Sequence, residues 1–322
     1  MELRGLGTTG LASSAIGLGS LGFTGGYGAA DCDESIATVR HALDIGVTLL
    51  DTADFYGGGR VEELIGAAIR GRRADAVVAT RGGATFTPEG RPTGLDGRPE
   101  SLRAACDASL RRLGVERIDL YSLARVDPAV PIEDSVGALA GLVAAGKVRH
   151  IGVSEVTADE LRRAHAVHPL ATVASEYSLL DRSIEADVLP AARELGVGIV
   201  ACSPLGRALL SGQLSSVDQL GAGDFRHNHP RFSPENLHRN RELVRVAEAI
   251  AAEKDVSIGR LALAWLLAQG PDIVPIPGTR TRTHLEMNAA ATQIRLTDDE
   301  RERLALAVPP GAVAGGREPR RR

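Results

Sequence analysis

The sequence contains little cysteine, no long hydrophobic run and no excess of positive charge. Only three of its 322 residues are cysteines, Cys32, Cys106 and Cys202. Their number is odd and their spacing matches no metal site, so we expect free thiols in a reducing compartment. The formal net charge of −4 argues against nucleic acid as the main partner. No apolar run approaches the roughly 18 residues of a membrane span, so no membrane interaction is expected.

Other features are absent as well. The N-terminus lacks the form of a signal peptide because Glu2 and Arg4 interrupt any apolar region, and we therefore expect a cytoplasmic protein. There is no internal repeat. With 43% hydrophobic and 24% charged residues, the composition is typical of a globular protein. The length allows two domains, but a single α/β barrel also fills it.

The most informative stretch covers residues 49–66. The apolar run at 47–50 suits a strand buried on both faces, the glycines at 57–59 interrupt it, and helical spacing follows. Such a strand delivers Asp51 at its carboxyl end and Tyr56 just beyond, which is where barrel enzymes keep their chemistry. The alternative is that Asp51 caps a turn and Tyr56 packs in a loop.

The alternation of a short apolar strand with a helix continues along the chain. Besides the strand before Asp51, strands are expected at residues 16–20, 76–81, 118–125, 147–154, 171–177, 197–203 and 272–278. Eight such strands predict an α/β fold of the (β/α)8 TIM-barrel type, preceded by a β-hairpin within residues 1–16. A doubly wound sheet is the competing fold, but residues 17–22 lack its G-x-G-x-x-G loop. We expect one domain over residues 1–308 and a disordered Pro-, Gly- and Arg-rich tail over 309–322.

Segments spread over most of the chain resemble motifs of the aldo-keto reductases. These segments are residues 51–66, 77–81, 110–128, 146–155, 175–179, 203–206 and 276–288. The resemblance implies a TIM barrel with C-terminal helices and loops over its mouth. It also implies NADP(H) as cofactor and a small organic molecule as substrate.

The catalytic tetrad of the resembled family is only partly matched. Asp51 and Tyr56 correspond to its Asp and to the Tyr that protonates the substrate carbonyl. Arg81 stands where a Lys is expected, and Ala124 stands where a His is expected. A guanidinium can still lower the pKa of Tyr56, whereas Ala124 cannot donate a hydrogen bond. Arg81 is also expected to form a salt bridge with Asp51, and both roles can hold together.

The resemblance also implies a set of cofactor-binding residues. Residues 203–206 resemble the pyrophosphate loop, and residues 278–280 resemble the clamp on the 2′-phosphate. The expected cofactor-binding residues are Ser154, Glu155, Glu176, Ser203, Leu205, Gly206, Gly278, Thr279, Arg280 and Asn288. At the nicotinamide end the pattern changes, because Cys202 replaces an aromatic residue and Ala174 replaces a Gln. No metal site is expected, because the histidine pairs 165/168 and 227/229 lack a further ligand.

Three functions remain open from the sequence. The first is an NADP(H)-dependent oxidoreductase acting on a carbonyl or alcohol with an altered active site, in which Asp51, Tyr56 and Arg81 are catalytic. The second is a non-redox enzyme for dehydration, isomerisation or cyclisation on the same barrel. The third is a non-catalytic NADP-binding or regulatory protein. The loops at residues 23–32, 82–99 and 204–234 are expected to set the substrate, which the sequence does not name, and the oligomeric state stays open.

Overall fold

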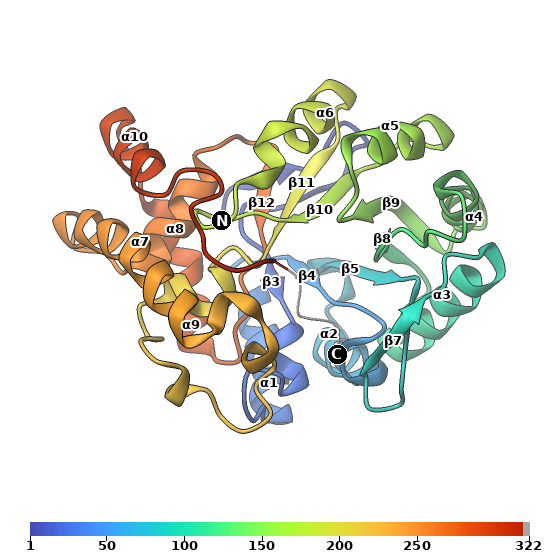
Figure 1. Ribbon diagram of the computed structural model, residues 1–322. Helices are drawn as coiled ribbons and strands as arrows, with labels where there is room; N and C mark the ends of the chain where they lie inside the picture. The colour runs from blue at the N-terminus through green and yellow to red at the C-terminus, as the bar shows by residue number, and fades with distance from the viewer. Residues whose placement is uncertain (318–322) are drawn as a thin grey trace.

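The computed structural model describes residues 1–317, and its centre is a barrel of eight parallel strands (Figure 1). The strands are β3 (Leu18–Gly19), β4 (Leu49–Asp51), β5 (Val77–Gly82), β8 (Ile118–Leu123), β9 (Val148–Ser154), β10 (Thr172–Glu176), β11 (Gly198–Cys202) and β12 (Ile273–Pro275). The barrel closes because the N–H groups of Gly17 and Gly19 donate to Pro275 and Pro277, at 2.9 and 3.2 Å. The expected (β/α)8 barrel is therefore confirmed.

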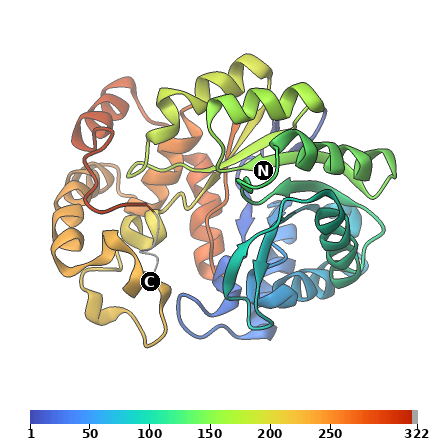
Figure 2. The same ribbon diagram turned by 45° about the vertical axis from the view of Figure 1, so that its right-hand side comes forward.

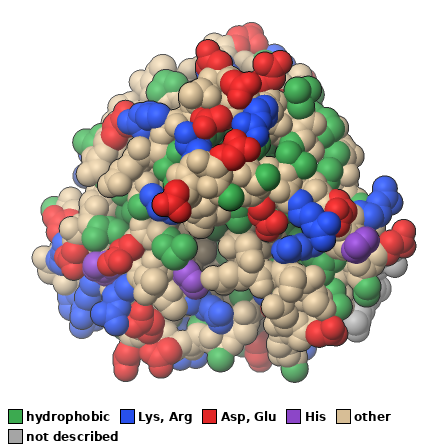
Figure 3. Space-filling view, turned by 90° about the vertical axis from the view of Figure 1, so that its left-hand side faces the viewer, with side chains coloured by type: hydrophobic (Ala, Val, Ile, Leu, Met, Phe, Trp, Pro, Cys, Tyr) green, Lys and Arg blue, Asp and Glu red, His purple; other side chains and the backbone are tan. Residues whose placement is uncertain are grey.

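Helices surround the strands, as Figures 1 and 2 show from two directions. Those of the ring around the barrel are α1 (Cys32–Asp44), α2 (Arg60–Ile69), α3 (Pro99–Leu113), α4 (Ile132–Ala144), α5 (Ala158–Val167), α6 (Val188–Leu195), α8 (Ile258–Leu267) and α9 (Arg282–Ala289). Two further helices, α7 (Pro234–Glu253) and α10 (Asp298–Ala307), pack against each other on one side of the barrel. On the face shown in Figure 3, acidic and basic side chains are interspersed. Within residues 1–317, every helix is too short or too polar to cross a membrane.

Local sequence signals explain where helices begin and end. Thr157 caps α5 by accepting a hydrogen bond from the N–H of Glu160, whose carboxylate bonds back to the Thr157 N–H. Gly146 follows the end of α4 with φ of +73°, a conformation that side chains other than glycine rarely adopt. Ser257 caps α8, since its side chain accepts a hydrogen bond from the Arg260 N–H.

The inside of the barrel is filled with small and branched apolar side chains. They are Leu49, Ala79, Leu120, Ala174, Val200 and Val274. The hairpin formed by β1 (Leu3–Gly5) and β2 (Ala12–Ser14) adds Leu6 and Leu11 to this cluster. Gly7 in the hairpin turn has no room for a side chain, because a Cβ would lie 2.6 Å from the Ala171 oxygen. The hairpin therefore closes the floor, and the carboxyl ends of the strands form the open mouth.

Two segments differ from expectation. The loop expected at residues 82–99 contains a second hairpin, formed by β6 (Ala84–Phe86) and β7 (Pro92–Leu95). The tail expected to be disordered from Pro309 instead runs from α10 across the mouth as far as Arg317, and Figure 1 shows it as the dark red segment. Polar contacts hold the segment in this position. Because such contacts leave no hydrophobic pattern in the sequence, the position could not be predicted from the composition. The rest of the expected tail, residues 318–322, lies outside the described residues.

Candidate active site

Asp51 and Arg81 form an ion pair at the mouth of the barrel. The register of β4 and β5 places Asp51 beside Ala79, so Arg81, two residues further along β5, points to the same side of the sheet. Nη2 of Arg81 donates to both carboxylate oxygens of Asp51, and both side chains are buried. Burial raises the pKa of Asp51, and the Arg81 guanidinium opposes this rise. The salt bridge expected from the sequence is present.

Tyr56 lies close to this ion pair. It begins the short turn η2 (Tyr56–Gly59) between β4 and α2, and its ring meets that of Phe55 edge to face with the centroids 5.1 Å apart. Burial raises the pKa of the Tyr56 phenol, and the positive charge of Arg81 is the main effect that lowers it. The arrangement therefore places a phenol, a guanidinium and a carboxylate together at the ends of two neighbouring strands.

The surroundings of this group are largely apolar. Ala124 follows β8 and is 3% exposed, and Ala174 is enclosed among the apolar side chains inside the barrel. Cys202 ends β11, and its sulfur lies 4.0 Å from Nη1 of Arg81. Burial raises the pKa of the Cys202 thiol, which favours its neutral form. Arg81 brings a permanent positive charge to this inner end.

A cavity of about 580 Å³ extends outward from the group. Asp51, Tyr56 and Cys202 line its inner end. Six of the residues expected to bind the cofactor also line it: Ser203, Leu205, Gly278, Thr279, Arg280 and Asn288. The other four expected cofactor residues, Ser154, Glu155, Glu176 and Gly206, are not among its lining residues.

The outer part of the cavity is rich in arginine. Nη1 of Arg280 donates to the carbonyl oxygen of Ala29 at 2.6 Å. Ser257, Gly259 and Arg260 bring the N-terminal end of α8 to the cavity wall. Nε of Arg260 is buried and has no hydrogen-bond partner within residues 1–317. Guanidinium groups together with a helix N-terminus favour an anionic ligand.

A contact between two loops covers part of this cavity and was not predicted from the sequence. The Phe225 N–H donates to the carbonyl oxygen of Gly26 at 3.1 Å, and the ring of Phe225 meets that of Tyr27 edge to face. The guanidinium of Arg226 lies over the Tyr27 ring, 4.9 Å from its centroid. Tyr27 and Arg226 both line the cavity. The sequence feature that could have pointed to this contact is Tyr27, an aromatic residue inside the glycine-rich segment 25–28.

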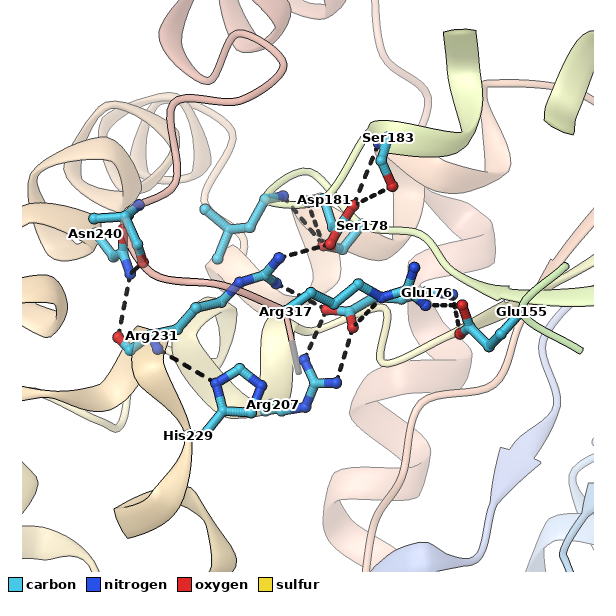
Figure 4. A network of polar contacts seen from close by, with 12 residues as sticks. Glu155, Glu176, Ser178, Asp181, Ser183, Arg207, His229, Arg231, Asn240 and Arg317 are labelled. Carbon is cyan, nitrogen blue, oxygen red and sulfur yellow. Dashed lines mark hydrogen bonds and ion pairs between the residues drawn. The ribbon is translucent and has the colours of Figure 1, made fainter. Parts of the chain in front are cut away.

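Glu155 and Glu176 form ion pairs with arginine side chains, as Figure 4 shows. The carboxylate of Glu176, which ends β10 and is 2% exposed, accepts two hydrogen bonds of 2.8 Å from Arg207 and one of 2.9 Å from Arg231. Arg317 donates to both Glu155 and Glu176. Burial raises the pKa of Glu176, and Arg207 is the main effect that lowers it. These two expected cofactor residues therefore bind arginines of this chain.

The remaining residues noted in the sequence are Ser154, the cysteines and the two histidine pairs. The Ser154 hydroxyl is buried and has no hydrogen-bond partner among residues 1–317. The cysteines are free thiols, as expected. His165 accepts a hydrogen bond from the Leu170 N–H, and within the described chain no three metal-binding side chains come together.

Comparisons with known proteins agree with this geometry. The model of the aldo/keto reductase family matches residues 15–307. A probable aldo-keto reductase of Glycine max is 42% identical over 315 residues, which cover 97% of this chain and 90% of the relative. The structure of glycerol dehydrogenase from Gluconobacter oxydans has a TM-score of 0.85 at 32% identity and covers 95% of this chain and 96% of its own. The structure of an aldo/keto reductase from Klebsiella pneumoniae in complex with NADP and acetate has a TM-score of 0.73 at 28% identity. The match covers 99% of this chain and 98% of that structure's chain. The chain belongs to the aldo-keto reductase family.

Proposed function

We propose that the protein is an NADP(H)-dependent oxidoreductase that interconverts a carbonyl and an alcohol on a small organic substrate. The observation that carries the proposal is one cavity with two chemically distinct ends. Tyr56 and the Asp51–Arg81 pair lie at the inner end, and arginines lie at the outer end. The NADP complex of the Klebsiella pneumoniae relative supports the choice of cofactor.

The residues at the outer end fit a dinucleotide with a 2′-phosphate. Arg280 would hold the 2′-phosphate, and the buried Nε of Arg260 offers a donor without a partner in the described chain. The backbone around Ser203 and Leu205 would hold the pyrophosphate. When bound, the cofactor supplies or accepts the hydride.

Tyr56 is proposed as the general acid and base. In the direction of reduction its hydroxyl gives a proton to the carbonyl oxygen, and in the direction of oxidation the phenolate takes that proton back. Burial opposes formation of the phenolate, while the permanent charge of Arg81 favours it. Asp51 holds Arg81 in place through the bonds to Nη2.

Arg81 also has a second donor that faces the inner end. Nη2 is used by Asp51, whereas Nη1 points toward Cys202. This donor supports a role for Arg81 in binding the carbonyl oxygen, which Ala124 cannot bind. A non-redox reaction is the second candidate, and the apolar character of Ala124, Ala174 and Cys202 favours it.

The test of the proposed function is NADPH oxidation with a panel of aldehydes and ketones, and NADP⁺ reduction with the corresponding alcohols. The proposal expects substrate-dependent turnover that Tyr56→Phe removes. Tight NADPH binding without turnover on any carbonyl or alcohol would favour the non-redox alternative. Absence of binding and turnover would refute the proposal.

A further inference from the structure

The C-terminal segment from Pro309 to Arg317 is seated on the barrel mouth by specific contacts. Oδ1 of Asn240, on α7, accepts a hydrogen bond of 2.7 Å from the Ala314 N–H, and Nδ2 donates to the Ala314 carbonyl at 3.0 Å. Gly315 follows with φ of +87°, and a Cβ there would lie 2.7 Å from the Arg231 nitrogen. These contacts fix the path of the backbone just before Arg317.

Arg317 then bridges two carboxylates on neighbouring strands. It donates through Nη2 to Glu155, which follows β9, and through Nε to Glu176, which ends β10, at 3.2 Å. Glu155 is itself tied to β10, because its Oε1 accepts the Glu176 N–H at 2.9 Å. Figure 4 shows Arg317 between the two glutamates.

Among residues 1–317, the ion pairs of this network join three guanidinium groups, one of them from Arg317, to three carboxylates. Its cations are Arg207, Arg231 and Arg317, and its carboxylates are Glu155, Glu176 and Asp181. The Glu176 side chain is 2% exposed and that of Asp181 is 5% exposed. Removal of one cation leaves an excess negative charge where solvent screens it poorly, and this is costly.

The network reaches the cavity through Arg207, which pairs with Glu176 and lines the cavity. Arg207 and Ala208 both have the left-handed backbone, with φ of +55° and +77°, which is unfavourable for residues other than glycine. Both line the cavity that we assign to the cofactor. The two hydrogen bonds from the Arg207 side chain to Glu176 hold this strained turn in place. Glu176 therefore links the C-terminal segment to the loop at 203–211.

We propose that Arg317 is a positioning residue of the cofactor site. By pairing with both Glu155 and Glu176 it keeps the Glu176 carboxylate aligned for Arg207, and thereby fixes the loop at 203–211 against the cavity. The effect on the cofactor rests on the proposed function. The effect on the loop does not, and it can be measured without any ligand.

The first experiment measures amide hydrogen exchange of the cofactor-free protein. Peptides covering residues 203–211 should exchange several-fold faster in Arg317→Ala than in wild type, while peptides from the barrel strands remain unchanged. Arg303→Ala is the matched control, because it removes another C-terminal arginine, whose ion pair with Glu253 joins α10 and α7. Unchanged exchange at 203–211 in Arg317→Ala would overturn the proposal.

The second experiment measures NADPH affinity by quenching of protein fluorescence. Arg317→Ala should bind about tenfold more weakly, as expected for one lost charge-assisted contact. Arg317→Lys should recover part of the loss, and Glu155→Gln in the Arg317→Ala background should recover part of it by removing the uncompensated charge. Equal NADPH affinity of wild type and Arg317→Ala would overturn the positioning role. If wild type itself bound no NADPH, the proposed function would fail, while the exchange experiment would still decide whether Arg317 holds the loop.

Discussion

The two ends of the cavity differ in the chemistry they present. The outer end carries Arg260 and Arg280 beside the N-terminus of α8, and it suits the phosphates of a dinucleotide. The inner end carries Tyr56 and the Asp51–Arg81 pair among apolar residues. Under the proposed function, binding of the cofactor and reactivity toward the substrate would therefore depend on different residues. If the proposal holds, we expect tight binding of NADP(H) together with slow reduction of generic carbonyls.

The largest effect is expected at the inner end, from Tyr56→Phe. The substitution removes the proposed proton donor but keeps the ring that packs on Phe55. Turnover should fall by about 10²–10⁴-fold, the range typical of general acid–base catalysis. NADPH affinity and the unfolding temperature should stay close to wild type. Retention of full turnover would show that Tyr56 is a packing residue.

The next largest effect is an expected gain of activity. Arg81→Lys together with Ala124→His restores the pattern of the family, and it adds a hydrogen-bond donor for the developing oxyanion. Such a donor is worth about 10²–10³ in rate. Reduction of 4-nitrobenzaldehyde with saturating NADPH should rise toward that range, with each single variant as a control. No gain would mean that other parts of the inner end also limit hydride transfer.

At the outer end, Arg280→Ala should affect the binding of NADP(H) but not the binding of NAD(H). Loss of the contact with the 2′-phosphate should weaken NADP(H) binding by about 1.5–3 kcal/mol and leave NAD(H) binding unchanged. Arg282→Ala is a suitable control, because Arg282 pairs with Glu34 and is not among the residues that line the cavity. Equal affinity of wild type for NADPH and NADH, measured by titration, would contradict this assignment.

The smallest effect concerns stability and a second carboxylate near the inner end. Asp54 is 3% exposed, its Oδ1 has no hydrogen-bond partner among the described residues, and burial raises its pKa to about 7. A carboxyl with a raised pKa stabilises the fold most at low pH, and this contribution is lost as the pH rises toward 7. Asp54→Asn should therefore gain stability relative to wild type by about 2 kcal/mol between pH 5 and pH 7. Denaturation at both pH values measures it, and a constant difference would refute the assignment.

Much of the fold could be predicted from the sequence because buried strands and amphipathic helices carry clear patterns. Strands were expected at residues 118–125 and 147–154, and β8 and β9 lie within these ranges. The Asp51–Arg81 pair could be predicted too, since the ends of neighbouring parallel strands meet at one edge.

The seating of the C-terminal segment could not be predicted. Its Pro-, Gly- and Arg-rich composition gives no hydrophobic signal, and Arg317 finds its partners on strands more than 140 residues away. The contact of Tyr27 with Arg226 joins two loops whose meeting depends on the finished barrel. The buried face of a helix or strand gives a periodic pattern of apolar residues in the sequence. Polar contacts between distant segments give no such pattern.

The most direct test of the comparison between the two ends is one stopped-flow experiment on the wild-type protein. NADPH is mixed with the enzyme, binding is followed by fluorescence, and 4-nitrobenzaldehyde is then added while the absorbance of NADPH is recorded. We expect saturable NADPH binding, weaker binding of NADH, and slow but measurable oxidation that Tyr56→Phe abolishes. Fast oxidation of this generic aldehyde would contradict the altered inner end, and failure to bind NADPH would contradict the role given to the outer end.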